Sequence, residues 1–214
     1  MGESVWEAKC RAADVIHASH LPSFVPSFSK KKSCFLETCS VLEEAGQLVA
    51  SAAAATINRG NLCINRFSTA ESLTGGLVAS HIVDIAGSSA VFAGGIVAYQ
   101  NEIKENLLDV PHQILETKGA VSAETVKAMA QGALKKFGCK WAIATSGIAG
   151  PGGAEPGKPV GTVWMCVAHC LQNEAFCKIF AGNRTEVREK SVYSVLGKLL
   201  FLLNNQKSTC TSEH

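Results

Sequence analysis

The sequence lacks three features that would place it in a particular class of protein. No apolar run approaches the roughly 18–20 residues that a helix needs to cross a bilayer. The 20 Lys and Arg residues are dispersed and nearly balanced by 18 Asp and Glu, leaving a net charge of +2. No Cys-x-x-Cys pair occurs among the nine cysteines, so the usual spacing of a zinc or redox site is missing. We therefore expect no membrane partner, no nucleic-acid partner and no metal.

The cysteines are better explained as small hydrophobic residues. Cys166, Cys170 and Cys177 fall in apolar segments, where free thiols are usually buried. His169 lies between two of them, but in a strand it would point to the opposite face of the sheet. So many unpaired thiols favour a reducing compartment, and we expect a cytoplasmic protein.

The first forty residues differ in composition from the rest. Residues 21–32 are rich in Pro, Ser and Lys, so we predict that residues 1–40 form a flexible leader. It lacks the apolar stretch of a secretory signal, and three acidic residues among its first 14 weaken a transit peptide but leave organellar targeting open. With 47% hydrophobic residues, the remainder can build one core. We predict one domain over residues 41–205 and a polar tail over residues 206–214.

Beyond residue 40, helical and strand patterns alternate. We predict helices near residues 41–58, 75–85, 101–108, 123–137 and 184–203, and strands near residues 62–70, 91–99, 141–145, 160–169 and 174–181. Gly94 and Gly95 indicate a bulge or a close backbone approach within a strand, and Gln172-Asn173 a hairpin turn. This alternation predicts an α/β fold with layered sheet and helices.

Polar residues gather at three places where an apolar run ends. Ser72 precedes Gly75-Gly76, Tyr99 and Lys104 follow the next strand, and Ser146-Gly147 open a glycine-rich loop. Hydroxyls, one lysine and many backbone N–H donors at such junctions indicate one active site, in which a lysine activates a serine for nucleophilic attack. No histidine competes for the role of base, because His81, His112 and His169 are predicted in a helix, a loop and a strand end.

A lysine can act as base only if its pKa is lowered towards neutrality. If Asn101 caps the predicted helix, Lys104 lies in its first turn, where the positive end of the helix dipole disfavours the ammonium form. The backbone N–H groups of residues 73–76 could hold either an oxyanion or a phosphate, and Ser146 and Gly147 could supply the other set of donors.

Each of these residues also has an ordinary structural explanation. Ser72 could cap the helix that follows it, and Lys104 could be a solvated helix lysine. Tyr99 could be a strand-end aromatic residue whose hydroxyl is exposed to water. Arg184 or Arg188 could reach a phosphate, or could instead form surface ion pairs with Glu186 or Glu189.

Five motifs carry a resemblance to a known family. They are AESLTGG (70–76), AGSSAVFAGGIVAYQNEIK (86–104), GAVS (119–122), SGIAGPGG (146–153) and KPVGTVW (158–164). In this order and spacing they resemble the C-terminal domain of CinA. The resemblance covers residues 41–203, with two departures: Leu73 replaces a more familiar Cys, and Asn183 an Asp. CinA has a larger N-terminal domain, for which the forty-residue leader is too short, so we expect the stand-alone form, nicotinamide mononucleotide deamidase.

The resemblance implies a single-domain, three-layer α/β/α sandwich that hydrolyses the carboxamide of nicotinamide mononucleotide to nicotinate mononucleotide and ammonia. Ser72 would be the nucleophile and Lys104 the base, with Tyr99 beside them. Residues expected to bind the substrate are Glu71, Thr74, Gly75, Gly76, Asn101, Ser146, Gly147, Arg184 and Arg188. The expected partner is a small-molecule nucleotide, with neither a metal nor an organic cofactor, and a homo-oligomer is left open. The alternative is a related domain that binds a nucleotide, or serves an accessory role, without catalysis.

Overall fold

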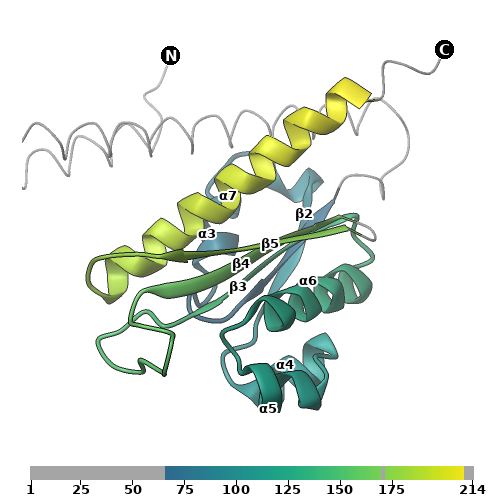
Figure 1. Ribbon diagram of the computed structural model, residues 1–214. Coiled ribbons are helices and arrows are strands. Elements are labelled where there is room, and N and C mark those ends of the chain that lie inside the picture. Colours follow the sequence, from purple (N-terminus) through teal and green to yellow (C-terminus); the bar gives the residue numbers. More distant parts are fainter. Residues whose placement is uncertain (1–65, 170–171, 210–214) are drawn as a thin grey trace, which may run out of the picture. The chain divides into compact units, whose positions relative to one another are not determined.

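A five-stranded mixed sheet forms the centre of the protein (Figure 1). The computed structural model describes residues 66–169 and 172–209. The strands lie in the order β2-β1-β3-β4-β5, and their bounds are β1 Phe67–Glu71, β2 Phe92–Val97, β3 Trp141–Gly147, β4 Thr162–His169 and β5 Gln172–Ile179. β1 pairs in parallel with both β2 and β3, whereas β4 is antiparallel to β3 and to β5. The carboxyl ends of β1, β2 and β3 therefore meet at one edge of the sheet.

Helices cover both faces of this sheet. Their bounds are α3 Leu77–Val83, α4 Asn101–Leu108, α5 His112–Lys118, α6 Ala123–Phe137 and α7 Arg184–Thr209, with a short 3-10 turn over Ser88–Ala90. α6 packs on one face with α4 and α5 outside it, and α7 and α3 pack on the other face (Figure 1). The predicted α/β class and the three-layer sandwich are confirmed.

Alternation along β3 separates the two halves of the core. Trp141 and Ile143 belong to the apolar cluster beneath α3 and α7, while Ala142 and Ala144 belong to the cluster beneath α6. Successive side chains of a strand point to opposite faces, so small residues on one side let a helix approach closely. Two helices also approach closely at Gly132 of α6, where an added Cβ would lie 1.9 Å from the carbonyl oxygen of Leu108 in α4.

Local signals in the sequence predicted α6 and the irregularity of β2. The side chain of Ser122 caps α6 by accepting a hydrogen bond from the Thr125 N–H, and Gly138 ends the helix in the left-handed conformation. The pairing of β1 with β2 changes register between Phe67 and Ser68. Gly95 is a close approach as well, because a Cβ there would lie 2.2 Å from Thr69 Oγ1.

Four predicted boundaries were wrong. α5 begins at His112, which was predicted in a loop, and β5 already begins at Gln172, so Gln172-Asn173 is not the turn. α3 begins after the glycine pair rather than at Gly75, and α7 continues to Thr209, past residue 203 where the helix was predicted to end. The predicted helix over residues 41–58, most of the first predicted strand and the leader lie outside the described residues. No helix in the described ranges is long and apolar enough to span a bilayer.

Candidate active site

A cavity of about 180 Å³ opens where the three parallel strands end. Ser72 follows β1, Tyr99 follows β2, and Ser146 and Gly147 end β3; all four line the cavity, together with Lys104 of α4 and Arg184 of α7. The connection after β1 runs over the face covered by α3 and the connection after β2 over the face covered by α6, and ligands of open α/β sheets bind at the carboxyl ends of strands at such points. The fold thus brings together residues that are up to 112 positions apart, from Ser72 to Arg184.

Lys104 is a buried residue of this cavity. The residue is only 1% exposed, and its Nζ donates a hydrogen bond to the carbonyl oxygen of Tyr99 at 2.9 Å. Among the described residues, no carboxylate forms an ion pair with it. Burial lowers the pKa of Lys104 from 10.5 to about 8, because the charged ammonium loses the stabilisation that water provides.

The cause of this shift differs from the one that the sequence predicted. Gln100, rather than Asn101, occupies the N-cap position of α4, and its side chain makes no cap hydrogen bond. Asn101 is an exposed first residue of the helix, and it does not line the cavity. The pKa of Lys104 is therefore lowered by burial and not by a capped helix terminus.

Ser72 extends the sheet beyond the end of β1. Its N–H donates to the Thr145 carbonyl at 2.9 Å, and its own carbonyl accepts from the Gly75 N–H at 3.1 Å, which closes a tight turn. Its side chain does not cap α3. Within the described ranges no hydrogen bond joins Ser72 Oγ to Lys104 Nζ, although both groups line one cavity. Such catalytic hydrogen bonds commonly tighten only when a substrate is bound.

Glu71 and Thr74 were expected at the substrate, but their side chains lie inside the fold. The Glu71 carboxylate is 1% exposed and accepts hydrogen bonds from the N–H groups of Gly76, Val78 and Ala79 at 2.8–3.0 Å, so it caps α3. The Thr74 hydroxyl is fully buried and shares a 2.7 Å hydrogen bond with Thr145. Neither residue lines the cavity, and both stabilise the segment that carries Ser72.

The turn after Ser72 leaves two N–H groups available. Gly75 N–H donates to Ser72, Gly76 N–H to Glu71, and Leu77 N–H to Thr74. For the N–H groups of Leu73 and Thr74, the described part of the chain provides no acceptor, although both residues are buried. Leu73 also lines the cavity, so this pair replaces the broader set of donors that the sequence predicted.

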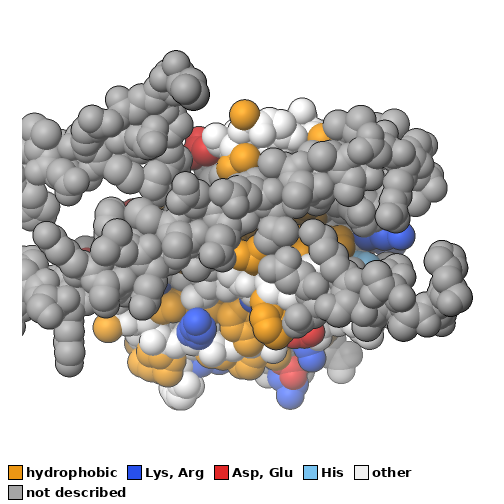
Figure 2. Space-filling model, turned by 90° about the horizontal axis from the view of Figure 1, so that it is seen from above, with side chains coloured by type: hydrophobic (Ala, Val, Ile, Leu, Met, Phe, Trp, Pro, Cys, Tyr) orange, Lys and Arg blue, Asp and Glu red, His pale blue; other side chains and the backbone are white. Residues whose placement is uncertain are grey.

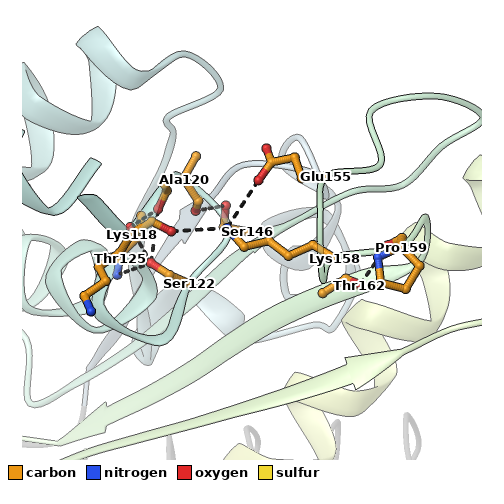
Figure 3. Close-up of polar contacts among 10 residues, drawn as sticks. Lys118, Ala120, Ser122, Thr125, Ser146, Glu155, Lys158, Pro159 and Thr162 are labelled. Carbon is orange, nitrogen blue, oxygen red and sulfur yellow. Dashed lines mark hydrogen bonds and ion pairs between the residues drawn. The ribbon is translucent and has the colours of Figure 1, made fainter. Parts of the chain in front are cut away.

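The hydroxyl of Ser146, a residue expected at the substrate, already donates its proton within the protein. Its hydroxyl proton is donated to the carbonyl oxygen of Ala120 at 2.7 Å, and the residue is 1% exposed (Figure 3). A serine hydroxyl has one proton and two lone pairs, so Ser146 can only accept a hydrogen bond from a ligand. Next to it, Gly147 leaves no room for a side chain, because a Cβ would lie 2.6 Å from the Thr162 carbonyl oxygen.

The segment before α6 and the loop after β3 form a wall that the sequence did not reveal. Ala120 and Val121 line the cavity. Lys158 fastens the loop to this segment, since its Nζ donates to the Lys118 carbonyl at 3.1 Å and pairs with Glu155 at 3.3 Å (Figure 3). Ala120, Val121 and Lys158 lie in motifs that carry the family resemblance, but their residue types alone give no indication of a site.

The two arginines at the start of α7 have different partners. Arg184 donates to the Tyr99 hydroxyl and to the Gly150 carbonyl, both at 3.1 Å, and lines the cavity. Arg188 does not line it, and donates instead to the carbonyls of Leu73 and Thr74 at 3.1 and 2.7 Å. Neither forms the surface ion pair considered from the sequence, within the residues that the structure describes.

Asn183 accounts for one of the departures from the family pattern. Its side chain accepts from the Glu186 N–H while Glu186 accepts from the Asn183 N–H, each at 3.0 Å. This reciprocal pair is a capping box at the start of α7, for which Asn and Asp are about equally suited. The Asn therefore retains the capping role without an acidic group.

The described residues contain no cluster of three His, Cys, Asp or Glu side chains that could hold a metal ion. Cys166 is buried, and burial raises the pKa of its thiol to about 12. Cys177, expected to be buried, is exposed. None of His81, His112 and His169 lines the cavity. On the face seen in Figure 2, the visible Lys and Arg side chains are interspersed with acidic and hydrophobic ones.

Comparison with known proteins identifies relatives of this chain. The model of the CinA C-terminal domain matches residues 47–203. A CinA-like protein from Geotalea daltonii is 50% identical over 132 residues, which cover 62% of this chain and 32% of that protein. The chain thus spans about a third of the length of the curated relatives it matches.

Solved structures resemble it over most of their length. The competence damage-inducible protein A from Klebsiella pneumoniae is 38% identical with a TM-score of 0.67, covering 75% of this chain and 97% of the other. The competence/damage inducible protein CihA from Agrobacterium tumefaciens is 34% identical with a TM-score of 0.69, covering 86% and 99%.

Proposed function

This chain belongs to the CinA C-terminal domain family, and on that premise we propose that it hydrolyses the carboxamide of nicotinamide mononucleotide to nicotinate mononucleotide and ammonia. The observation that carries the proposal is Lys104, a buried lysine that forms no ion pair with any described carboxylate and lines the same cavity as Ser72. Burying a lysine costs free energy, and buried groups with an altered pKa concentrate at active sites. A domain that only binds a nucleotide has no need for it.

In the proposed reaction, neutral Lys104 accepts the proton of Ser72 as Oγ attacks the carboxamide carbon. The carbonyl oxygen becomes an oxyanion, to which the N–H of Leu73, a residue that lines the cavity, donates. Lys104 then returns the proton to the departing nitrogen, the carbon–nitrogen bond breaks, and ammonia leaves an ester on Ser72. Lys104 then accepts a proton from water as the water oxygen attacks the ester, and returns it to Ser72 Oγ as the ester bond breaks; the acid released loses its proton to become the carboxylate.

The size and charge of the cavity suit one end of this substrate. At about 180 Å³ it is smaller than the roughly 300 Å³ at which pockets for larger ligands begin, so it matches the pyridine ring with its carboxamide. Arg184, exposed and lining the cavity, provides a guanidinium for the phosphate, and Tyr99 fixes that guanidinium through its hydroxyl. No step requires a metal or an organic cofactor.

Ammonia release from nicotinamide mononucleotide by the purified protein tests the proposal. We expect Ser72→Ala to lower kcat at least a thousandfold while the circular dichroism spectrum and melting temperature stay close to the parent's, since loss of a nucleophile removes the covalent route. A parent protein that releases no ammonia, or an alanine variant that keeps more than about a hundredth of the parent's rate, would contradict it.

A further inference from the structure

We infer that Arg188 is a positioning residue for this reaction: from α7 it holds the turn that carries Ser72 and sets the direction of the N–H groups that follow it. The inference rests on the proposed function and assigns Arg188 a role other than phosphate binding. It is carried by hydrogen bonds between segments that are 114 and 115 residues apart in the sequence.

One guanidinium binds two successive carbonyl groups of the turn. Arg188 Nε donates to the Leu73 oxygen at 3.1 Å, and Nη2 donates to the Thr74 oxygen at 2.7 Å. Hydrogen bonds from a charged donor are stronger than neutral ones, and the planar guanidinium fixes the angle between its two donors. The two carbonyls are therefore held in a fixed relative orientation.

Fixing the carbonyls also fixes the donors that face away from them. In a planar trans peptide the C=O and the next N–H point in opposite directions, so the bond to the Leu73 oxygen orients the Thr74 N–H. The bond from Gly75 N–H to the Ser72 oxygen restrains the other end of the same turn. Thr74 N–H and Leu73 N–H are the two donors for which the described chain provides no acceptor.

The turn is held from two sides. Glu71 fixes it to the start of α3 through three backbone N–H groups. Arg188 covers it from α7, close enough that a Cβ added at Gly75 would lie 3.5 Å from Nη2. α7 is itself anchored at this point, because the neighbouring Val187 is fully buried in the core.

The two arginines at the start of α7 thus have different roles, although the sequence offered phosphate binding as a role for either of them. Arg184 lines the cavity and faces a ligand, whereas both of the Arg188 donors with known partners are used by the turn. A residue that binds phosphate contributes to substrate affinity, while a residue that orients the nucleophile and the oxyanion donors contributes to the rate of the chemical step.

Steady-state kinetics and hydrogen exchange of the full chain test the inference. The variants are Arg188→Gln and the conservative Arg188→Lys, which keeps the positive charge but loses the planar guanidinium with its two donors. Lys190→Gln is the matched control, because it removes an exposed cation from the same helix. Lys190 Nζ donates a hydrogen bond to the Ala181 carbonyl oxygen, away from the turn. Melting temperatures establish that each variant is folded.

We expect Arg188→Gln to lower kcat by about ten- to a hundredfold with KM changed less than about threefold, because misplacing a reacting group by an ångström costs rates of this size. The kcat of Arg188→Lys should lie between those of Arg188→Gln and the parent, and the kcat of Lys190→Gln should equal that of the parent. Exchange of the amides of residues 72–79 should be at least about tenfold faster in Arg188→Gln than in Lys190→Gln.

Two results would overturn the inference: a rise in KM at unchanged kcat, which indicates a ligand contact, or unchanged amide exchange in residues 72–79. The exchange experiment needs no substrate. A parent protein without amidase activity would therefore refute the proposed function while leaving this measurement to decide whether Arg188 holds the turn.

Discussion

Lys104 lies where an ammonium group is destabilised by its surroundings, being 1% exposed with the Tyr99 carbonyl as the acceptor of its hydrogen bond. A carbonyl can accept a hydrogen bond from the neutral amine as well as from the ammonium, so this contact orients Nζ in both protonation states. An acidic partner would instead hold the proton on the lysine. The environment therefore suits a group that must take up and release a proton.

The activity should depend on pH in the direction that a lysine base requires. Only the neutral amine accepts a proton, and burial lowers the pKa of Lys104 to about 8, so kcat/KM should rise with pH and level off above about pH 8. Lys104→Arg should be nearly inactive despite its charge, because guanidinium is not deprotonated in this range. Rate–pH profiles of the parent and the variant check this, and an active arginine variant would eliminate Lys104 as base.

Motifs predicted the residues of the cavity better than they predicted what each residue does. Ser72, Tyr99 and Lys104 were expected together and line one cavity. Glu71 and Arg188 were expected at the substrate, yet they bind the backbone around Ser72. A carboxylate or guanidinium has the same sequence signature whether it meets a ligand or a peptide group, so only the folded contacts separate the two roles.

At the scale of elements, α4 depends on α6 for its place. The Leu108 carbonyl, at the end of α4, lies against Gly132 in the middle of α6, and Lys104 is one turn before it. Glycine normally weakens a helix interior by about 1 kcal/mol relative to alanine. Here it permits the two backbones to approach.

Gly132→Ala should therefore destabilise the protein, although helix propensity alone predicts the opposite. The added Cβ would lie 1.9 Å from the Leu108 oxygen, so the helices must separate, and overpacking of this kind costs about 1–3 kcal/mol. Displacing α4 moves Lys104, so kcat should also fall. Urea unfolding and the amidase assay check both effects; a more stable, fully active variant would show that α4 is not held in this way.

The bounds of elements with capping residues at their ends could be predicted from the sequence, whereas the bounds of elements set by packing or strand pairing could not. Ser122 and Gly138 marked both ends of α6. α5 has no side-chain cap and spans only His112–Lys118, too short to show a helical period. β5 begins at Gln172 because it pairs with His169 of β4, and this pairing overrides the turn preference of Gln172-Asn173.

For the whole molecule, burying Lys104 lowers the free energy of unfolding, although the proposed activity requires this residue. Apolar clusters lie on both sides of the sheet, and charging a lysine buried in the protein lowers the free energy of unfolding. The folded protein binds fewer protons than the unfolded chain between the lowered pKa of about 8 and the usual 10.5. Stability should therefore rise with pH across this interval.

Lys104→Met should accordingly be inactive but more stable. Methionine keeps the apolar stem without the charge, and since one pKa unit corresponds to about 1.4 kcal/mol, the gain at pH 7 should be on the order of 2 kcal/mol. The gain should be complete below pH 8 and shrink towards pH 10.5. Denaturant unfolding at pH 7 and at pH 10 measures it, and a variant less stable at pH 7 would mean that the ammonium is well accommodated.

The hydrogen bond from Ser146 to Ala120 bears on how the reaction ends. Because its proton is already used, the hydroxyl can receive the N–H of a carboxamide but offers only lone pairs to a carboxylate. Hydrolysis would thus turn an attractive contact into a repulsive one, and product release would be driven by the chemistry itself. We expect nicotinate mononucleotide to inhibit with a constant at least about tenfold above the KM of the amide, and Ser146→Ala to narrow that gap. Equal affinities of the parent protein for the amide and for nicotinate mononucleotide would mean that the cavity does not distinguish substrate from product.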